Sequence, residues 1–252
     1  MSALALRIIA CVCMLLDHIG YFFGGRYPFL TPLRWIGRIA FPLYVFLIVN
    51  GFRHTSNRPR YALRLAIFAV ISQVPFALMS HPGKMLGTLN VFVTLLLALL
   101  TVWATDAMRK HRYTKYVCFL PTLAVFCLYY FGLIHSDYGA KGILLAMTFY
   151  LFDGKRVLTA LGMLVSIYHP YLISLGFALL HLLQGRQAAI QPLSEWELTQ
   201  LFSLLSLVFI FLYNGKKGRL PASRVGAKAV QLGFYAFYPA HMLLLYALKQ
   251  LL

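Results

Sequence analysis

Long apolar stretches separated by short polar loops occupy most of this chain of 252 residues. Most of them are close to the roughly 20 residues that an α-helix needs to cross a lipid bilayer. We therefore predict about nine helical spans, with eight or ten as the neighbouring possibilities. The expected bounds are 4–24, 35–52, 61–80, 88–107, 116–134, 138–152, 157–183, 197–213 and 229–251.

The composition supports a lipid-embedded fold. Hydrophobic residues make up 61% of the chain and charged residues only 12%, whereas soluble domains average about 25% charged residues. Such a chain cannot cover a water-facing surface, but a polytopic membrane protein has lipid as its outer solvent. We predict an all-α transmembrane bundle that forms one integral-membrane domain over residues 1–252, because no shift in composition marks a second domain.

Two spans and the cysteines need separate comment. The first stretch is interpreted as a retained helix, since Arg7 lies inside it, Asp17 interrupts it and no cleavage site follows. His169 and Pro170 lie inside 157–183 and predict a kink there. The four cysteines lie in apolar runs without metal-ligand spacing, so no metal site is predicted.

The basic residues predict the orientation in the membrane. A net charge of +17 on a soluble protein would indicate nucleic acid, but here the charges lie in the loops between spans, and no nucleic-acid partner is predicted. The loops after spans two, four, six and eight carry 14 basic residues, and the opposite side carries four. By the positive-inside rule the first side is cytosolic. The N-terminus is then inside and the C-terminus outside.

Polar side chains of six spans reach a similar depth in this topology, between the midplane and the outer face. They are Asp17, His18, Arg38, Gln73, Asn90, Asp137, Tyr138 and His241, whereas Arg64 lies near the cytosolic end of its span. An ionisable group at that depth costs several kcal/mol unless it is paired or faces water. We expect these residues to share one hydrated cavity. The alternative is a buried ion-pair staple without chemistry.

Neighbouring positions in this layer face different ways. Asp17 and His18 are about 100° apart around a helix, so a bond between them is not expected. Asp17 is instead expected to pair with Arg38 or to orient His241.

Six motifs carry a resemblance to a known family. "LDHIG", "GRIAFPLYVF", "LRLAIFAVISQVPF", "LNVFVTL", "DYGAKGILL" and "FYPAHMLLL" follow one another over nearly the whole chain. In order and spacing the chain resembles the TraX family, named for the plasmid-encoded membrane protein that acetylates the N-terminus of conjugative pilin. The family is also distantly similar to larger membrane acyltransferases. The resemblance implies an acetyltransferase of the bacterial inner membrane, with acetyl-CoA as donor and no metal.

The same resemblance implies site residues. The matching positions are Asp17, His18, Arg38, Arg64, Gln73, Asn90, Asp137, Tyr138, Tyr238 and His241. Acyl transfer needs a base, and neutral imidazole serves near pH 7. Either His18 or His241 is therefore a candidate base, and Asp17 and Asp137 are further catalytic candidates. Transfer also needs donors at the developing oxyanion. The remaining residues are expected to bind substrate or donor.

Donor and acceptor are expected to meet from opposite sides. The nucleotide of acetyl-CoA stays near Arg64 and the inner loops, and the acceptor, a peptide or glycan amine or hydroxyl, comes from outside. An acetyl-histidine relay is the alternative route. The rival functions are a transporter or channel that uses the same polar layer and an assembly factor without chemistry.

Overall fold

The computed structural model describes residues 1–80, 84–184, 186–187, 192–219 and 221–251. Within these ranges the regular structure is helical, apart from one isolated bridge between Leu89 and Ser136. The helices are α1 Ala3–Phe23, η1 Pro28–Leu30, α2 Leu33–Gly37, α3 Ala40–His54, α4 Arg58–Ser80, α5 Val91–Lys110, η2 Thr114–Val117, α6 Leu120–Tyr130, α7 Gly139–Leu151, α8 Arg156–Leu183, α9 Glu195–Thr199, η3 Gln200–Leu205, α10 Ser206–Phe211 and α11 Arg224–Leu251. The predicted all-α class is confirmed.

The predicted span count of nine is not confirmed. In the described ranges five helices are long and apolar enough to cross a membrane, and three apolar helices are shorter. The predicted span 116–134 contains only η2 and the 11-residue helix α6, because Pro121 stands at its start and Gly132, at φ +68°, follows its end. Predicted span two, which contains α2 and α3, lies within one of the five, Pro28–His54. Predicted span eight is divided between α9, η3 and α10, and predicted span nine, in α11, is not among the five.

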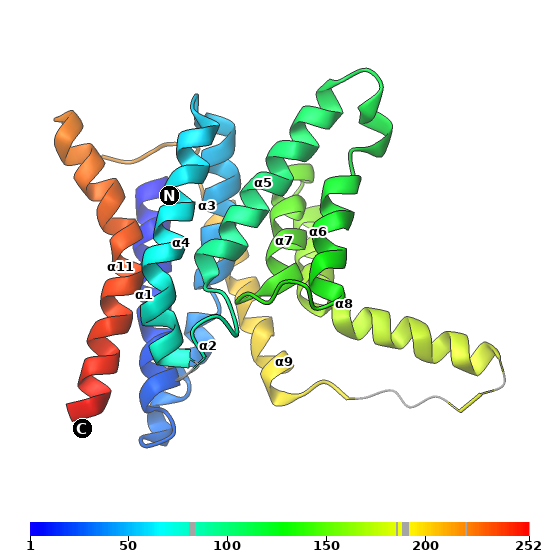
Figure 1. Cartoon of the computed structure of the whole chain (residues 1–252), viewed down its shortest axis with the longest axis horizontal. Coiled ribbons are helices and arrows are strands. Elements are labelled where there is room, and N and C mark those ends of the chain that lie inside the picture. Colours follow the sequence, from blue (N-terminus) through cyan, green and yellow to red (C-terminus); the bar gives the residue numbers. More distant parts are fainter. Residues whose placement is uncertain (81–83, 185, 188–191, 220, 252) are drawn as a thin grey trace.

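The long helices form an upright bundle. Helix α1 packs against α2, α3 and α11, helix α4 packs against α5 and α11, and α5 packs against α7. Figure 1 shows α11 beside α1 and α4, with the two termini towards opposite ends of the bundle. The turn between α3 and α4 and the connections after α5 and α10, which carry basic residues, lie at one end.

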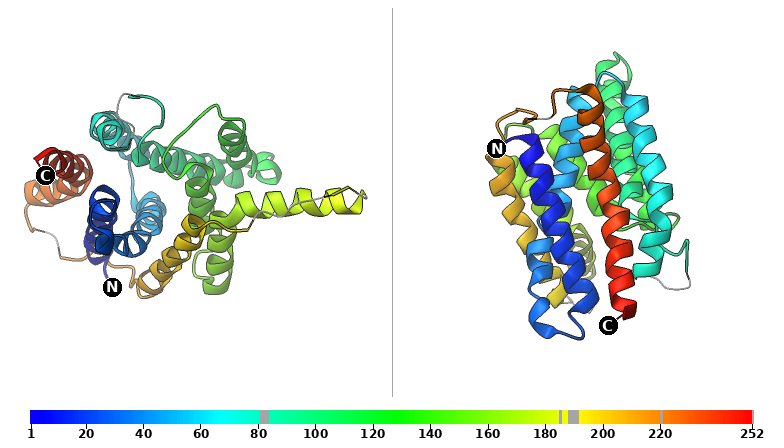
Figure 2. Two further views of the ribbon diagram at one scale, coloured as in Figure 1. Left: turned by 90° about the horizontal axis from the view of Figure 1, so that it is seen from below. Right: turned by 90° about the vertical axis from the view of Figure 1, so that its left-hand side faces the viewer.

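Helix α8 leaves the bundle part-way along its length. It is continuous over 28 residues with Pro170 inside. Its second half projects sideways from the other helices (Figures 1 and 2). A proline removes one backbone hydrogen bond and its ring clashes with the preceding turn, which gives a physical cause for such a change of direction.

An ion network holds the basic end of the bundle together. The carboxylate of Asp106 on α5 is only 11% exposed and pairs with Arg58 of α4 at 3.2 Å and with Lys110 at 2.8 Å. The hydroxyl of Tyr150 on α7 donates to the same carboxylate at 2.9 Å. This network therefore ties three helices to one another.

Replacing Asp106 with alanine is expected to destabilise the fold. The substitution removes the acceptor shared by Arg58, Lys110 and Tyr150, and a hydrogen bond to a charged group contributes about 1.5–3 kcal/mol. The matched control is Asp153→Ala, because Asp153 is 64% exposed in its pair with Arg53 and exposed pairs contribute about 1 kcal/mol or less. Thermal unfolding in one detergent measures both. Equal stability losses in the two variants would contradict the assigned role.

Candidate active site

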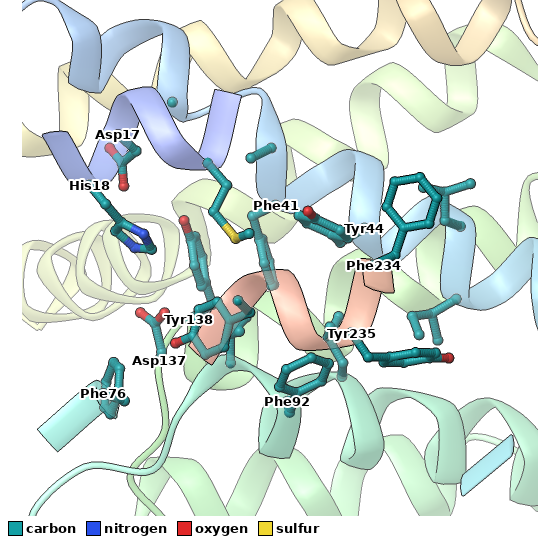
Figure 3. Close-up of a pocket in the computed structure, with 18 of the residues that line it drawn as sticks. Asp17, His18, Phe41, Tyr44, Phe76, Phe92, Asp137, Tyr138, Phe234 and Tyr235 are labelled. Atoms are coloured by element: carbon teal, nitrogen blue, oxygen red, sulfur yellow. The ribbon is translucent and has the colours of Figure 1, made fainter. Parts of the chain in front are cut away.

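An elongated cavity of about 310 Å³ lies between α1, α3, α4, α5 and α11. Figure 3 shows Asp17, His18, Asp137 and Tyr138 gathered at one end of it and the aromatic side chains of α11 at the other. The cavity therefore has a polar outer end, in the predicted orientation, and a mostly apolar body.

A carboxylate paired with two arginines forms the polar end. Arg38, which is 4% exposed, donates to Asp17 from its terminal nitrogen, and Arg34 lies 3.8 Å from the same oxygen. A Cβ on Gly37 would lie 2.2 Å from the Cβ of Asp17. Glycine therefore allows α2 to approach α1 closely enough for this pairing. Of the two predicted partners of Asp17, the structure shows Arg38.

The two candidate histidines are bonded to each other. His18 Nδ1 lies 2.6 Å from His241 Nε2, and the rings stack at 4.9 Å. His241 Nδ1 lies 2.6 Å from the carbonyl oxygen of Phe237, which can only accept. In the neutral pair this network assigns the proton of His241 to Nδ1, so His18 donates from Nδ1 and keeps a lone pair on Nε2. His18 lines the cavity, and His241 is not among the described residues that line it.

The loop before α7 supplies the opposite wall. Asp137 and Tyr138 line the cavity, and the ring of Tyr138 stacks on Phe41 at 3.6 Å between centroids. The backbone of Tyr138 has φ +63°, a left-handed conformation that costs a non-glycine residue about 1–3 kcal/mol. Such strain persists only where the surroundings impose it, and it concentrates at functional sites.

Two predicted donors, Gln73 and Asn90, support that loop and are not among the described residues that line the cavity. The amide nitrogen of Gln73 donates to the carbonyl groups of Met85 and Thr88, and its oxygen accepts from Asn90. Asn90 also caps α5 by accepting from the Phe92 amide at 3.0 Å. Their polar atoms are thus engaged within the protein.

The backbone of Leu89, next to Asn90, connects these hydrogen bonds to the loop that lines the cavity. The backbone of Leu89 accepts from the Asp137 amide at 2.8 Å and donates to the His135 carbonyl at 2.8 Å. Gln73 and Asn90 therefore hold the segment on which Asp137 and Tyr138 are positioned.

The inner end of the cavity carries a residue that the sequence interpretation did not select. Arg7 lines the cavity together with Tyr61 and Tyr235. Arg64 lies beside this end, with its guanidinium 5.5 Å from the centre of the Tyr61 ring. No carboxylate pairs with Arg7 or Arg64 among the described residues.

A periodicity argument would have found Arg7. It precedes His18 by 11 positions, which is about three helical turns and about 16 Å along one face of α1.

The structure thus gathers most of the predicted residues. Asp17, His18, Arg38, Asp137, Tyr138 and Tyr238 line one cavity, His241 lies behind His18, Arg64 lies at the far end, and Gln73 and Asn90 support a loop. The described residues contain no cluster of histidine, cysteine and carboxylate side chains that would hold a metal ion.

Comparison with known protein families matches residues 2–249 to the family described as TraX protein. The chain belongs to the TraX family. It is 30% identical over 261 residues to the "Probable fimbrial assembly protein FimC, serogroup H1" of Dichelobacter nodosus, covering 100% of this chain and 97% of that protein. It is 24% identical over 205 residues to the "Uncharacterized protein RP591" of Rickettsia prowazekii (strain Madrid E), covering 81% of this chain and 73% of that one. No solved structure matches.

The TraX motifs now have physical roles in this chain. "LDHIG" and "GRIAF" bring Asp17 to Arg38, and "FYPAH" places His241 on His18. "ISQVPF", "LNVF" and "DYGAK" form the hydrogen-bonded support of the opposite wall. Helices distant in the sequence of this TraX protein therefore meet at one cavity.

Proposed function

We propose that this TraX protein is an acetyltransferase that moves an acetyl group from cytosolic acetyl-CoA to an amine or hydroxyl in the outer half of the membrane. The observation that carries the proposal is the histidine pair. His241 fixes the proton of His18 on Nδ1, so Nε2 of His18 keeps a free lone pair. In the described residues no second hydrogen bond occupies that nitrogen. His18 is also the member of the pair that lines the cavity.

In this proposal His18 acts as the general base. Its Nε2 takes the proton of the acceptor as the acceptor atom bonds to the thioester carbon. The C–S bond then breaks, and the same proton passes from His18 to the departing sulfur, which leaves as the CoA thiol. Base catalysis of this kind contributes ~10²–10⁴-fold. His241 positions the ring of His18 and does not itself touch substrate.

Arg38 is suited to stabilise the oxygen that becomes negative. Its guanidinium is buried, held from one side by Asp17 and by its own Nε bond to the Arg34 carbonyl at 3.2 Å. A fixed, buried donor needs no reorganisation during the reaction, which is the main source of oxyanion stabilisation. Tyr138 and Asp137 line the same end.

The inner end fits the anionic part of the donor. Arg7 and Arg64 have no carboxylate partner in the described chain, and arginine binds phosphate through charge-assisted hydrogen bonds. The apolar body of the cavity between Arg7 and His18 suits an uncharged linker. The donor phosphates would then stay near the cytosolic face while the thioester reaches the polar end.

The acceptor is proposed to come from the outer side of a bacterial inner membrane. The relative from Dichelobacter nodosus bears the name of a fimbrial assembly protein, which supports the N-terminus of a pilin-like peptide as one acceptor. An envelope or extracellular glycan is the other acceptor that the same chemistry would serve. Neither acceptor requires a metal.

Incubation of the purified protein with acetyl-CoA labelled in the acetyl group and an envelope extract tests this proposal. We expect label to move into the extract and the thiol of CoA to appear in equal amount. Absence of both, with a folded protein that still binds CoA, would refute acetyl transfer.

Arg7→Gln is expected to weaken donor binding without removing the base. A hydrogen bond to a charged group contributes about 1.5–3 kcal/mol, so KM for acetyl-CoA should rise about tenfold or more while kcat changes little. Arg60→Gln is the matched control, because Arg60 is exposed at the same end of the bundle. A fall in kcat at unchanged KM would contradict the placement of the donor phosphates.

A further inference from the structure

A second cavity of about 520 Å³ adjoins the first. It lies between α6, the start of α7 and the middle of α8, and Thr88 and Tyr138 line both cavities. The two cavities therefore share a wall, and Tyr138 is part of it. Neither His18 nor Arg38 belongs to the second cavity.

The second cavity lies at the predicted outer side, next to an exposed loop. The loop that borders it is exposed, with Phe131 and Leu133 both 71% accessible. This loop is bridged to the segment around Leu89, which connects α4 to α5 at the end of the bundle opposite the turn between α3 and α4. A molecule from outside would reach this cavity without crossing the bundle.

Basic and aromatic groups line it. His135, Lys141 and His169 contribute the basic groups, Tyr129 and Tyr130 contribute phenol rings, and no carboxylate lines it in the described chain. His169 uses Nδ1 on the carbonyl of Ser166 at 3.0 Å. The charged and basic side chains that line the cavity are therefore all cationic or neutral, on an aromatic background.

The acidic group that faces Lys141 is already engaged. Glu197 interacts electrostatically with Lys141 but does not line the cavity; its carboxylate keeps its charge while it accepts from the amide and the hydroxyl of Ser194, at 2.8 and 2.9 Å, in a capping box. Among the described residues no ion pair forms with Lys141. Helix α7 also starts at this cavity without a side-chain cap, and a helix N-terminus adds to positive potential.

The segment that forms the shared wall is hydrogen-bonded to α5 and α6, and its backbone is strained at Tyr138. The Tyr129 hydroxyl lies 2.7 Å from Ser136 Oγ, which lies 2.7 Å from Thr94 Oγ1, and Thr94 donates to the Asp137 carbonyl. Tyr138, the next residue, has φ +63° and is followed by Gly139 at φ +45°. These two successive left-handed residues turn the chain sharply, with the ring of Tyr138 stacked on Phe41.

We infer that the second cavity is the acceptor site, and that it selects an acceptor that carries an anionic group close to the attacking hydroxyl or amine. The role of the ligand as acceptor rests on the proposed acetyl transfer. The anionic charge of the ligand is inferred from the side chains that line the cavity alone. The attacking group passes Tyr138 to reach the thioester beside His18. The anionic group stays with Lys141 and His169.

The charge preference can be measured without any enzyme assay. A cysteine is introduced by Ile134→Cys, since Ile134 lines the cavity, and its reaction is timed with an anionic (sulfonatoethyl) and a cationic (trimethylammonioethyl) methanethiosulfonate added from outside. Leu133→Cys is the matched control on the exposed neighbour, and the unsubstituted protein corrects for the native cysteines. Tyr130→Cys repeats the measurement at a second lining position.

We expect the anionic-to-cationic rate ratio to be about tenfold higher at position 134 than at position 133, as a nearby unit charge in a partly desolvated site implies. Adding Lys141→Gln should bring the two ratios together. Equal ratios at the two positions, or protection of position 134 from both outside reagents, would overturn the inference.

A substitution that fills the second cavity tests whether this cavity is needed for acetyl transfer. Ile173→Trp should lower label transfer to the envelope extract at least tenfold and leave binding of acetyl-CoA unchanged, because Ile173 lines the second cavity alone. Leu172→Trp is the control, since Leu172 is 44% exposed and outside the lining. Unchanged transfer in Ile173→Trp would refute the acceptor role. If the unsubstituted protein neither transfers label nor releases CoA, the proposed function itself is refuted.

Discussion

His18→Ala is expected to lower the rate of acetyl transfer per folded molecule by ~10²–10⁴-fold, the usual contribution of a general base. The substitution removes the imidazole that lines the cavity, which is the group proposed to take the proton from the acceptor. Binding of acetyl-CoA should persist, because the donor is held mainly by its phosphates at the other end. Label transfer and CoA binding, measured on the same detergent-purified sample, separate the two effects.

Two further histidine variants control this result. His241→Ala should cause a smaller loss and alter the pH profile, because the ring of His18 loses the acceptor that fixes its tautomer. His54→Ala should change nothing, since His54 lies at the other end of the bundle. A fully active but less stable His18→Ala would show that the histidine pair is only structural.

Asp17→Asn is expected to cause the largest loss of stability. Arg38 is 4% exposed and donates to the Asp17 carboxylate, so the amide removes the charge that pairs with a buried guanidinium. Breaking a buried pair on one side costs about 3–5 kcal/mol. The midpoint of thermal unfolding should therefore fall markedly, and activity should fall with the folded fraction.

The double variant Asp17→Asn with Arg38→Met separates structure from chemistry. Removing both charges takes away the uncompensated guanidinium, so much of the lost stability should return, as neutral replacements of buried pairs often show. Transfer should not return, because the donor to the oxyanion is absent. Recovery of activity together with stability would identify the pair as a staple without a catalytic part.

The order of the helices and the polar layer could be predicted from the sequence, because both depend on local composition. Apolar length predicted where helices lie, and the ionisable residues inside them marked the cavity. Span length was less predictable. In 116–134 the hydropathy continues, yet Pro121 and Gly132 bound a helix too short to span.

Contacts between helices were beyond the sequence because they depend on packing. Asp17 was expected to pair with Arg38 or to orient His241. The close approach of α2 to α1 at Gly37 allows the pair with Arg38. The bond between His18 and His241 joins residues 223 positions apart, and no sequence pattern indicates it. Gln73 and Asn90 matched donor positions of the family by residue type, but their amides are engaged in holding a loop.

The most direct test of the central claim uses protein reconstituted in vesicles with known orientation. Acetyl-CoA labelled in the acetyl group is supplied only on the side of the basic loops, and envelope acceptor only on the other side. The account predicts that label appears on the acceptor across the membrane, with one CoA thiol released on the donor side for each acetyl group transferred. Labelling only when donor and acceptor share a side, or no CoA release at all, would contradict it.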